Sequence, residues 1–279
     1  MNVPHLGGEL PKQDMAAFGA SSRNMPALFV GHGNPMSAIE DNPYSRAWRE
    51  LGATLPRPRV ILCISSHWET PGTRVTAMEV PPTLHDFGGF PQALFDVRYP
   101  APGSPEWAAR IARLDPHHPV ALDYDWGLDH GCWSVLCRMF PKANIPVLQL
   151  SLDRSKTPAE HYQLGRALAP LREEGVLIVG SGNIVHNLRQ VVWRDVAHDW
   201  AIELDRIVAQ RIEAGDHAAL IDYPRLHPKA LLAVPTAEHY LPLLYILALQ
   251  EPHEPVHFFN ETVTLGALSM RSLQVGSPA

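Results

Sequence analysis

The chain has 279 residues, 46% of them hydrophobic and 19% charged, with a formal net charge of -6. A surplus of acidic side chains does not attract phosphate backbones or anionic lipid headgroups, so nucleic acids and membrane surfaces are not expected as partners. No stretch of the sequence approaches ~18 uninterrupted apolar residues, so no membrane-spanning helix is predicted. A small neutral or aromatic molecule suits this composition better as a substrate.

Cysteine and histidine usage narrows the class of protein further. The three cysteines, Cys63, Cys132 and Cys137, are too few and wrongly spaced for a disulfide framework or a zinc ribbon, and they favour a reducing, cytoplasmic setting. Histidine is more informative, because 15 histidines stand beside only 23 lysines and arginines together. Histidine is the commonest metal ligand and carries protons near neutral pH, so its positions along the chain matter most.

The first half of the chain predicts short apolar strands that alternate with helices. Residues 1–24 lack the apolar stretch of a secretory signal and are expected to form a flexible leader before a single domain at residues 25–279. In chain order we expect a strand at residues 27–30, a helix at 43–51, strands at 60–65 and 74–78, a long loop at 80–105, a helix from Pro105 to Leu114 capped by Ser104, and a loop at 124–131. A loop as long as residues 80–105 is typical of a lid or a pocket wall.

The second half continues the same alternation. We expect a strand at residues 145–150, a helix to about Arg172 that begins with a capping box at Thr157 and Glu160, a strand at 176–180, helices at 197–213 and 236–249, and closing strands at 256–259 and 268–275. This pattern predicts one α/β domain with a mostly parallel sheet that helices cover on both faces. In such sheets, ligands bind beyond the carboxyl ends of the strands.

Three histidines follow predicted strands and are therefore expected at one edge of the sheet. His32 lies between two glycines after the first strand, His67 follows the second, and His186 follows the strand at residues 176–180. Each could be a metal ligand, or a histidine that is hydrogen-bonded to the local backbone. His239 or the adjacent Glu238, in the first turn of the helix predicted at 236–249, could complete the set. Two histidines and a carboxylate suit an Fe(II) oxygenase, whereas three histidines also suit zinc, and spacing does not choose between them.

Further candidates could handle protons or contact a ligand. His130 follows Asp129, whose carboxylate could orient the ring or raise its pKa, although an ordinary loop pair explains the motif equally well. His186 could be a proton shuttle or a further metal ligand. His85 lies in the long loop and could line a pocket or merely belong to a lid. Eight other histidines of the predicted domain have polar or surface-like neighbours: His117, His118, His161, His198, His217, His227, His253 and His257.

Several well-known signatures do not occur in the sequence. There is no Gly-x-Gly-x-x-Gly turn, Walker loop, Gly-x-Ser-x-Gly elbow or His-Glu-x-x-His motif. Nucleotide cofactors and serine hydrolysis therefore have no support from the sequence.

A series of short strings, in this order, resembles the DOPA-dioxygenase branch of the class III (LigB-like) extradiol dioxygenases. The strings are MPALFVGHG at 25–33, SSHW at 65–68, PPTLHDFGGFP at 81–91, YPAPG at 99–103, DHG at 129–131, SGNIVHNL at 181–188 and PTAEHY at 235–240. The resemblance covers roughly residues 25–276. It implies that the domain at 25–279 is the catalytic domain of a non-haem Fe(II) enzyme that uses O₂ to open a catechol such as DOPA beside its two hydroxyl groups, giving a ring-opened semialdehyde.

The resemblance also implies roles for individual residues. His32, His67 and His239 are expected to bind the metal, which could be zinc in purified protein. The wider superfamily has a glutamate as third ligand, so Glu238 stays an alternative to His239. His186 matches a position described as catalytic or metal-facing, and Asp129 with His130 resembles the second acid–base pair.

Aromatic side chains near these strings could contact the substrate, and two other functions stay open at this point. Trp68, Phe87 and Phe90 could stack on the catechol ring, with His85 nearby. A zinc hydrolase could use the same histidines, and a binding protein without enzymatic activity could keep the pocket. The expected partners are a small catechol and O₂, and the expected state is a monomer or small homo-oligomer. The physiological catechol and the position of ring cleavage stay open.

Overall fold

The computed structural model describes residues 24–277, so almost all of the leader predicted at 1–24 lies outside the described residues. Its first half contains β1 (Ala27–Gly31), η1 (Pro35–Ala38), α1 (Pro43–Thr54), β2 (Val60–Thr70), β3 (Thr73–Thr76), α2 (Gln92–Phe95), α3 (Pro105–Ala112), β4 (Val120–Asp123) and α4 (His130–Met139). Its second half contains β5 (Val147–Asp153), α5 (Pro158–Ala167), α6 (Pro170–Glu173), β6 (Val176–Gly182), η2 (Leu188–Gln190), α7 (Asp199–Glu213), α8 (His217–Ile221), η3 (Tyr223–Arg225), α9 (Ala230–Ala233), α10 (Leu241–Ala248), β7 (Val256–Phe259), β8 (Val263–Thr264), β9 (Leu268–Ser269) and β10 (Ser272–Val275).

Eight strands form one central sheet in the order β4-β3-β5-β2-β6-β1-β10-β7. The central pairs β5–β2, β2–β6 and β6–β1 are parallel, as is β3–β4. Antiparallel pairs join β3 to β5, β1 to β10 and β10 to β7. The sheet is therefore mostly parallel, and the predicted α/β single-domain fold is confirmed.

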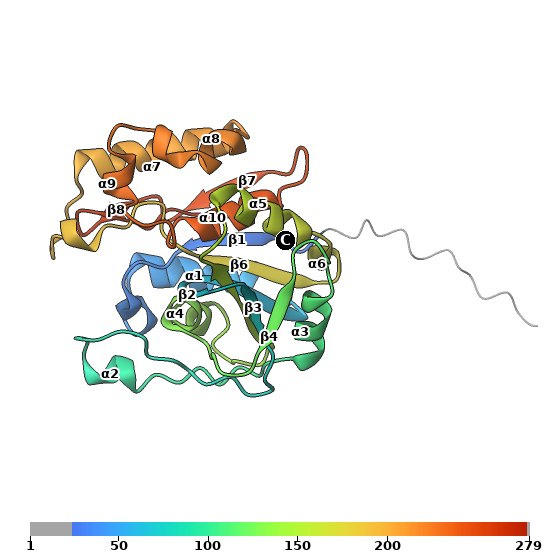
Figure 1. Ribbon diagram of the computed structural model, residues 1–279. Coiled ribbons are helices and arrows are strands. Elements are labelled where there is room, and N and C mark those ends of the chain that lie inside the picture. The colour runs from blue at the N-terminus through green and yellow to red at the C-terminus, as the bar shows by residue number, and fades with distance from the viewer. Residues whose placement is uncertain (1–23, 278–279) are drawn as a thin grey trace, which may run out of the picture.

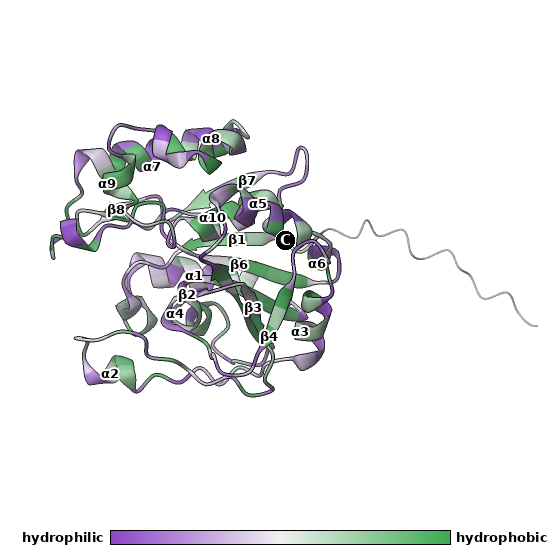
Figure 2. Cartoon of the chain, in the orientation of Figure 1, coloured by the Kyte–Doolittle hydropathy of each residue, from purple (hydrophilic) through white to green (hydrophobic). Residues whose placement is uncertain are grey.

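Helices cover both faces of the sheet because alternate side chains of the buried strands point to opposite sides (Figure 1). Ala27 and Phe29 of β1 join one apolar cluster with α5, α7 and α10. Leu28 and Val30 of the same strand join a second cluster with α1 and α4. Figure 2 shows the corresponding hydrophobic colouring along the central strands. Burying a side chain such as Leu28 or Phe29 contributes about 1.5–3 kcal/mol, so these two clusters supply most of the driving force for folding.

Two helix starts agree with the expected caps. The Ser104 hydroxyl accepts a hydrogen bond from the Trp107 amide at the start of α3. At the start of α5, Thr157 and Glu160 form both hydrogen bonds of the capping box. Such caps satisfy backbone amides that have no partner inside the helix, which is why they mark helix starts in a sequence.

Four expectations for local structure were wrong. Strand β4 and helix α4 were not predicted, and α4 begins at His130 inside the expected loop at 124–131. Strand β2 continues to Thr70, so His67 lies within the strand rather than after it. Helix α10 begins at Leu241 rather than at 236, since the Thr236 hydroxyl donates to Glu238 instead of capping a helix. The closing strand expected at 268–275 is interrupted between β9 and β10.

Within residues 24–277, no helix combines the length and the apolar composition needed to cross a membrane.

Candidate metal centre

Five histidines from separate parts of the chain line one cavity of about 260 Å³. They come from the ends of β1 and β6, from within β2, from the first residue of α4 and from the turn before α10. The histidines are His32, His67, His130, His186 and His239. The cavity lies beyond the carboxyl ends of the central strands, where the parallel topology predicts a ligand site.

The segment that carries His32 passes close to a distant part of the chain. A Cβ atom on Gly31 would lie 2.7 Å from the carbonyl carbon of Met270, so only glycine fits there. The Gly31 amide donates to the Ser272 hydroxyl at 3.0 Å, across 241 positions of sequence. Gly33 has a φ of 56°, which favours glycine. The glycines on either side of His32 are therefore explained by a close approach and a left-handed turn.

One hydrogen-bond chain sets the protonation of the His32 ring. The Ser181 hydroxyl donates to the Gly131 carbonyl at 2.6 Å, so towards His32 it acts as an acceptor. His32 Nδ1 lies 3.0 Å from that hydroxyl and must carry the proton. The lone pair of His32 then lies on Nε2, which faces the cavity. Second-sphere contacts of this kind are how proteins orient a histidine that binds a metal.

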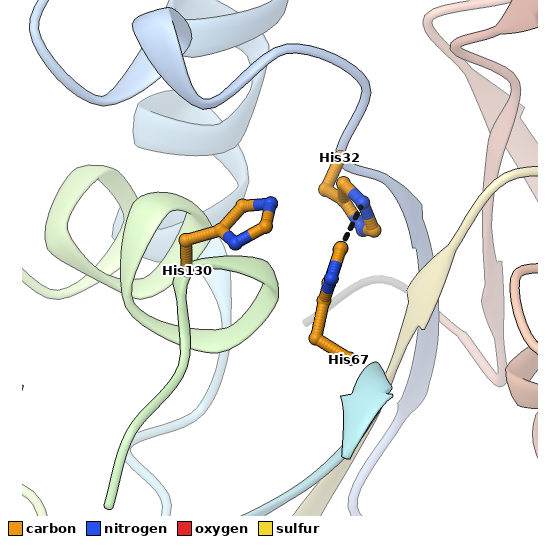
Figure 3. Close-up of side chains that lie close together, drawn as sticks. All are labelled: His32, His67 and His130. Atoms are coloured by element: carbon orange, nitrogen blue, oxygen red, sulfur yellow. Dashed lines mark hydrogen bonds between the residues drawn. The ribbon is translucent and has the colours of Figure 1, made fainter. Parts of the chain in front are cut away.

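His67 and His239 approach the same point as His32. The Nε2 atoms of His32 and His67 are 3.2 Å apart. A dashed line joins these two rings in Figure 3. The ring centres lie 5.1 Å apart for His32 and His67, 5.4 Å for His32 and His239, and 5.0 Å for His67 and His239. With metal–nitrogen bonds of about 2.1 Å, rings that share one ion have centres about 4.5–5.3 Å apart. Two of the three spacings lie within this range and the His32–His239 spacing lies just above it, so the three rings are close enough to share a single ion.

The ring of His239 supplies a second test of that fit. Its Nδ1 lies 3.1 Å from Oε1 of Glu238, which turns Nε2 towards the cavity. That Nε2 is buried and has no hydrogen-bond partner among the described residues. A buried polar atom without a partner is costly, and a bound cation would satisfy it. Glu238 is not among the residues that line the cavity, so its carboxylate orients His239 and is poorly placed to replace it.

The possible ligand atoms also form two groups that share no residue. In one group His32, His67 and His130 lie within 4.8 Å of one another, and in the other His186, Glu238 and His239 do so. His186 stacks on His239 with ring centres 3.4 Å apart and an interplanar angle of 5°. Its amide donates to the Ala233 carbonyl at 3.0 Å, which fixes its backbone. His186 thus lies beside His239, and His130 lies beside His67 with ring centres 3.9 Å apart.

Burial keeps the rings of His32, His67, His186 and His239 neutral. Burial and the neighbouring histidines lower the pKa of His32 and of His239 well below its usual value. Burial, followed by the His130 charge, lowers the pKa of His67 to about 3. Burial lowers the pKa of His186 to about 4, even though Glu238 opposes the shift. A metal binds neutral imidazole, so the cluster is in its binding form at neutral pH.

Comparison with known proteins identifies the family. The family described as the catalytic LigB subunit of aromatic ring-opening dioxygenase matches residues 26–270. The chain belongs to the LigB family. It is 51% identical over 262 residues to 4,5-DOPA dioxygenase extradiol of Escherichia coli K12, covering 92% of this chain and 96% of that protein. It is also 39% identical over 233 residues to the Beta vulgaris protein of the same name, covering 81% and 87%.

A solved structure agrees with this assignment. The crystal structure of an uncharacterized protein from E. coli K12 matches with a TM-score of 0.80 and 46% identity, covering 90% of this chain and all of the other. This LigB-family chain is therefore an enzyme of the extradiol dioxygenase type. That finding favours the oxygenase over the zinc hydrolase and over the binding protein without activity. A cytoplasmic location and a monomeric or small oligomeric state stay predictions.

The carboxylate that contacts His130 in this LigB-family chain is that of Asp86, and the expectation for Asp129 was wrong. Asp86 Oδ2 lies 3.0 Å from His130 Nδ1 and 3.6 Å from His67 Nδ1, and Oδ1 accepts the His130 amide at 2.9 Å. Burial alone would raise the pKa of Asp86, but its contacts with His130 hold that pKa below the ordinary value. Asp129 instead caps α4 and accepts hydrogen bonds from Ser65 and Gln149, both at 2.7 Å.

Two of the four residues expected to contact substrate line the cavity, and two do not. Phe87 and Phe90 line it, with ring centres 5.4 Å apart. Trp68 is not a lining residue; it is buried and stacks on Trp126 at 5.6 Å. It follows His67 in β2, and successive side chains of a strand point to opposite faces. His85 also lies outside the lining, with Nε2 3.1 Å from the Val97 carbonyl.

Sequence reasoning missed other parts of the cavity wall. Asp86 lies within the string PPTLHDFGGFP that carried part of the family resemblance, so its position was available as a signal. Leu188 likewise ends the string SGNIVHNL. The apolar lining residues Val191, Trp193, Leu265 and Leu268 had no such signal, because they come from loops and short strands without periodicity.

Proposed function

We propose that this LigB-family enzyme holds one Fe(II) with His32, His67 and His239 and cleaves a catechol ring beside its two hydroxyl groups, using O₂. The observation that carries this proposal is the convergence of the three rings, with centres 5.0–5.4 Å apart, around a point that the unpartnered Nε2 of His239 faces. Bound Fe(II) supplies coordination sites for the catechol oxygens and O₂ and a path for electrons between them. The same three histidines would also accept zinc, which makes the choice of metal part of the proposal.

The names of the relatives point to the substrate. Relatives from E. coli and Beta vulgaris are called 4,5-DOPA dioxygenase extradiol, so DOPA is the first catechol to consider here. A cavity of about 260 Å³ is small for a ligand site and suits one aromatic ring with a short substituent. Phe87 and Phe90 offer aromatic surface against which such a ring can pack.

His186 is proposed as the general base. Its ring lines the cavity, stacks on His239 and is neutral at pH 7 because burial lowers its pKa to about 4. A neutral imidazole can accept a proton from a catechol hydroxyl that approaches the metal ligands. His186 would thus touch the substrate directly, whereas His239 beside it faces the ion.

His130 is proposed as the general acid, with Asp86 as the residue that positions it. Asp86 holds the ring at Nδ1 and the backbone at the amide, which leaves Nε2 for the cavity. The carboxylate also stabilises positive charge on the ring, so that the ring can hold and then deliver a proton. A positioned acid or base contributes about 10²–10⁴ in rate.

Anaerobic loading followed by O₂ uptake tests the proposal. Protein stripped of metal is loaded with Fe(II) under nitrogen, mixed with a panel of catechols that includes DOPA, and then exposed to oxygen. We expect one O₂ consumed per catechol and a new absorbance from the ring-opened semialdehyde. The matched control is the same protein loaded with Zn(II). Equal turnover by the zinc form, or turnover without O₂, would contradict the proposal and support a hydrolase.

A further inference from the structure

The outer part of the cavity wall differs in character from the histidine end. It is formed by four apolar residues, which we call the apolar rim: Leu188, Val191, Trp193 and Leu265. Leu188 is 67% exposed and Trp193 is 74% exposed, whereas the histidines deeper in the cavity are largely buried. The cavity therefore runs from buried imidazoles to a hydrophobic mouth. Large apolar side chains that are exposed together at the mouth of a site often contact a ligand.

Backbone hydrogen bonds hold the apolar rim in place. The Val192 amide donates to the Leu265 carbonyl at 3.0 Å, and the Gly266 amide donates to the Val196 carbonyl at 2.7 Å. These bonds lie on either side of Trp193. At the other end of the segment, the Asn187 side chain donates to the Leu232 carbonyl at 2.7 Å. Trp193 is thus exposed but attached to a fixed backbone, which lowers the entropic cost of using it for binding.

Charge is the second feature that distinguishes the cavity. Apart from the histidines, Asp86 is the one ionisable residue among those that line it, and no lysine or arginine does so. Away from the metal that the proposed function places at the histidines, an anionic substituent in such a cavity has no cationic side chain to pair with, and an unpaired buried charge is costly. Arg189 and Arg194 lie in the same segment, but both are exposed and neither lines the cavity.

We propose that the apolar rim is a specificity site for an uncharged, apolar substituent on the catechol ring. The inference rests on the proposed function, because it takes the ring itself to be bound at the histidines. A substituent that points away from the histidines leads to the mouth, where Leu188 and Trp193 lose exposure as it binds. The substrate class is therefore a catechol with an alkyl, alkenyl or similar apolar side chain. A charged group at the end of a longer side chain, as in DOPA, would stay outside in water.

A homologous series of substrates tests whether the apolar rim contributes to specificity. The ratio kcat/KM is determined for catechol, 4-methylcatechol, 4-ethylcatechol and 4-propylcatechol with the Fe(II)-loaded enzyme. Each methylene group removed from water should raise kcat/KM about fourfold. Trp193→Ala should flatten this series, with the largest loss, about tenfold, for 4-propylcatechol and the smallest for catechol. Trp193→Phe should restore most of the slope, since it keeps an aromatic face.

Tyr124→Ala is the matched control, because Tyr124 is an aromatic residue that is 64% exposed and does not line the cavity. This variant should keep the slope of the unchanged enzyme. Equal losses for all four catechols in Trp193→Ala would overturn the proposal. So would a strong preference for 3,4-dihydroxyphenylpropionate over 4-propylcatechol that Arg189→Ala or Arg194→Ala removes.

Binding measurements separate failure of this inference from failure of the proposed function. Anaerobic calorimetric titration of the metal-loaded protein with the same four catechols reports affinity without turnover. One outcome is that no catechol is cleaved, while affinity still rises with the length of the alkyl substituent and falls in Trp193→Ala. That outcome would contradict the proposed function and support the binding role of the apolar rim. If all four catechols are cleaved at equal kcat/KM and bound with equal affinity, the proposed function is supported and the binding role of the apolar rim is contradicted.

Discussion

Buried histidines occur in two regions of this molecule that differ in almost every other respect. His161 in α5 is buried, and burial lowers its pKa to about 4, much as burial lowers that of His67 to about 3. Yet His161 Nδ1 is paired with the Tyr245 hydroxyl at 2.9 Å, in the apolar packing between α5 and α10. The histidine cluster instead has five rings around one cavity, and Nε2 of His239 there has no described partner.

The comparison shows which signals mark a reactive site. Burial and a lowered pKa are common to both regions, so neither separates a core histidine from a metal ligand. Convergence of rings from distant segments, together with a ring nitrogen that has no protein partner, occurs at the cavity and not at His161. The predictions below test that distinction, beginning with the largest expected effect.

Loss of a proposed ligand should remove the metal. His32→Ala or His67→Ala takes away one of three nitrogen donors and should weaken Fe(II) binding by more than the roughly 100-fold seen for residues behind the ligands. Metal analysis after anaerobic loading and desalting measures this. His161→Gln is the control and should keep one iron per chain. Stoichiometric iron in His32→Ala would contradict the ligand assignment.

Replacement of His186 should separate chemistry from metal binding. His186→Ala should keep iron but lose about 10²–10⁴ in turnover, because a general base is removed while three ligands remain. Steady-state rates and iron content are measured on the same sample. Loss of iron together with activity would instead make His186 a ligand, and near-normal rates would remove it from the reaction.

Asp86 should contribute a smaller effect through the two rings it contacts. Asp86→Asn keeps the shape but weakens the acceptor beside His67 and His130, so metal affinity should fall about 10–100-fold. The pH dependence of turnover should also change, because His130 loses its carboxylate. Competition for Fe(II) with a chelator reports the affinity. The exposed Asp125→Asn should leave it unchanged.

The smallest effect concerns His161 and stability. The pKa of His161 is about 4 when folded and about 6.5 when unfolded, so the unfolded chain binds the proton more readily between these values. Stability should therefore be unaffected above pH 6.5 and fall as pH drops towards 4, by about 1.4 kcal/mol per pH unit for this proton. Urea unfolding at several pH values measures it. The free energy of unfolding of His161→Gln should fall less steeply with decreasing pH than that of the unchanged protein. Equal slopes would contradict the lowered pKa of His161.

Much of the fold was predictable from the sequence because the central strands are continuous apolar runs. Strands β1, β2, β5 and β6 gave such runs, and they place His32 and His67 at one edge of the sheet. Helix α4 was missed because nearly all of it is buried, so it lacks the alternation of apolar and polar residues that reveals a surface helix. The burial of His161 was missed because its sequence neighbours are polar while its partner, Tyr245, is 84 positions away.

The candidate site was predictable in the histidines that line its cavity and less so in the residues around them. Predicted strand ends lead to His32, His67 and His186, and the strings that resemble the family add His239. The choice of Asp129 as the partner of His130 followed from adjacency in sequence, whereas the actual contact with Asp86 depends on how the loop at 80–105 folds back over α4. Trp68 was misplaced for a related reason, since β2 continues past His67 and reverses the direction of the next side chain.

The contact between Gly31 and residues far along the chain has a consequence for biosynthesis. The amide next to His32 is held by Ser272, and Met270 packs against the same glycine. A growing chain on the ribosome therefore carries four of the five histidines well before the element that fixes the first of them has been made. If the proposed ligands hold a metal, their site would reach its final geometry only after β10 has left the exit tunnel and paired with β1.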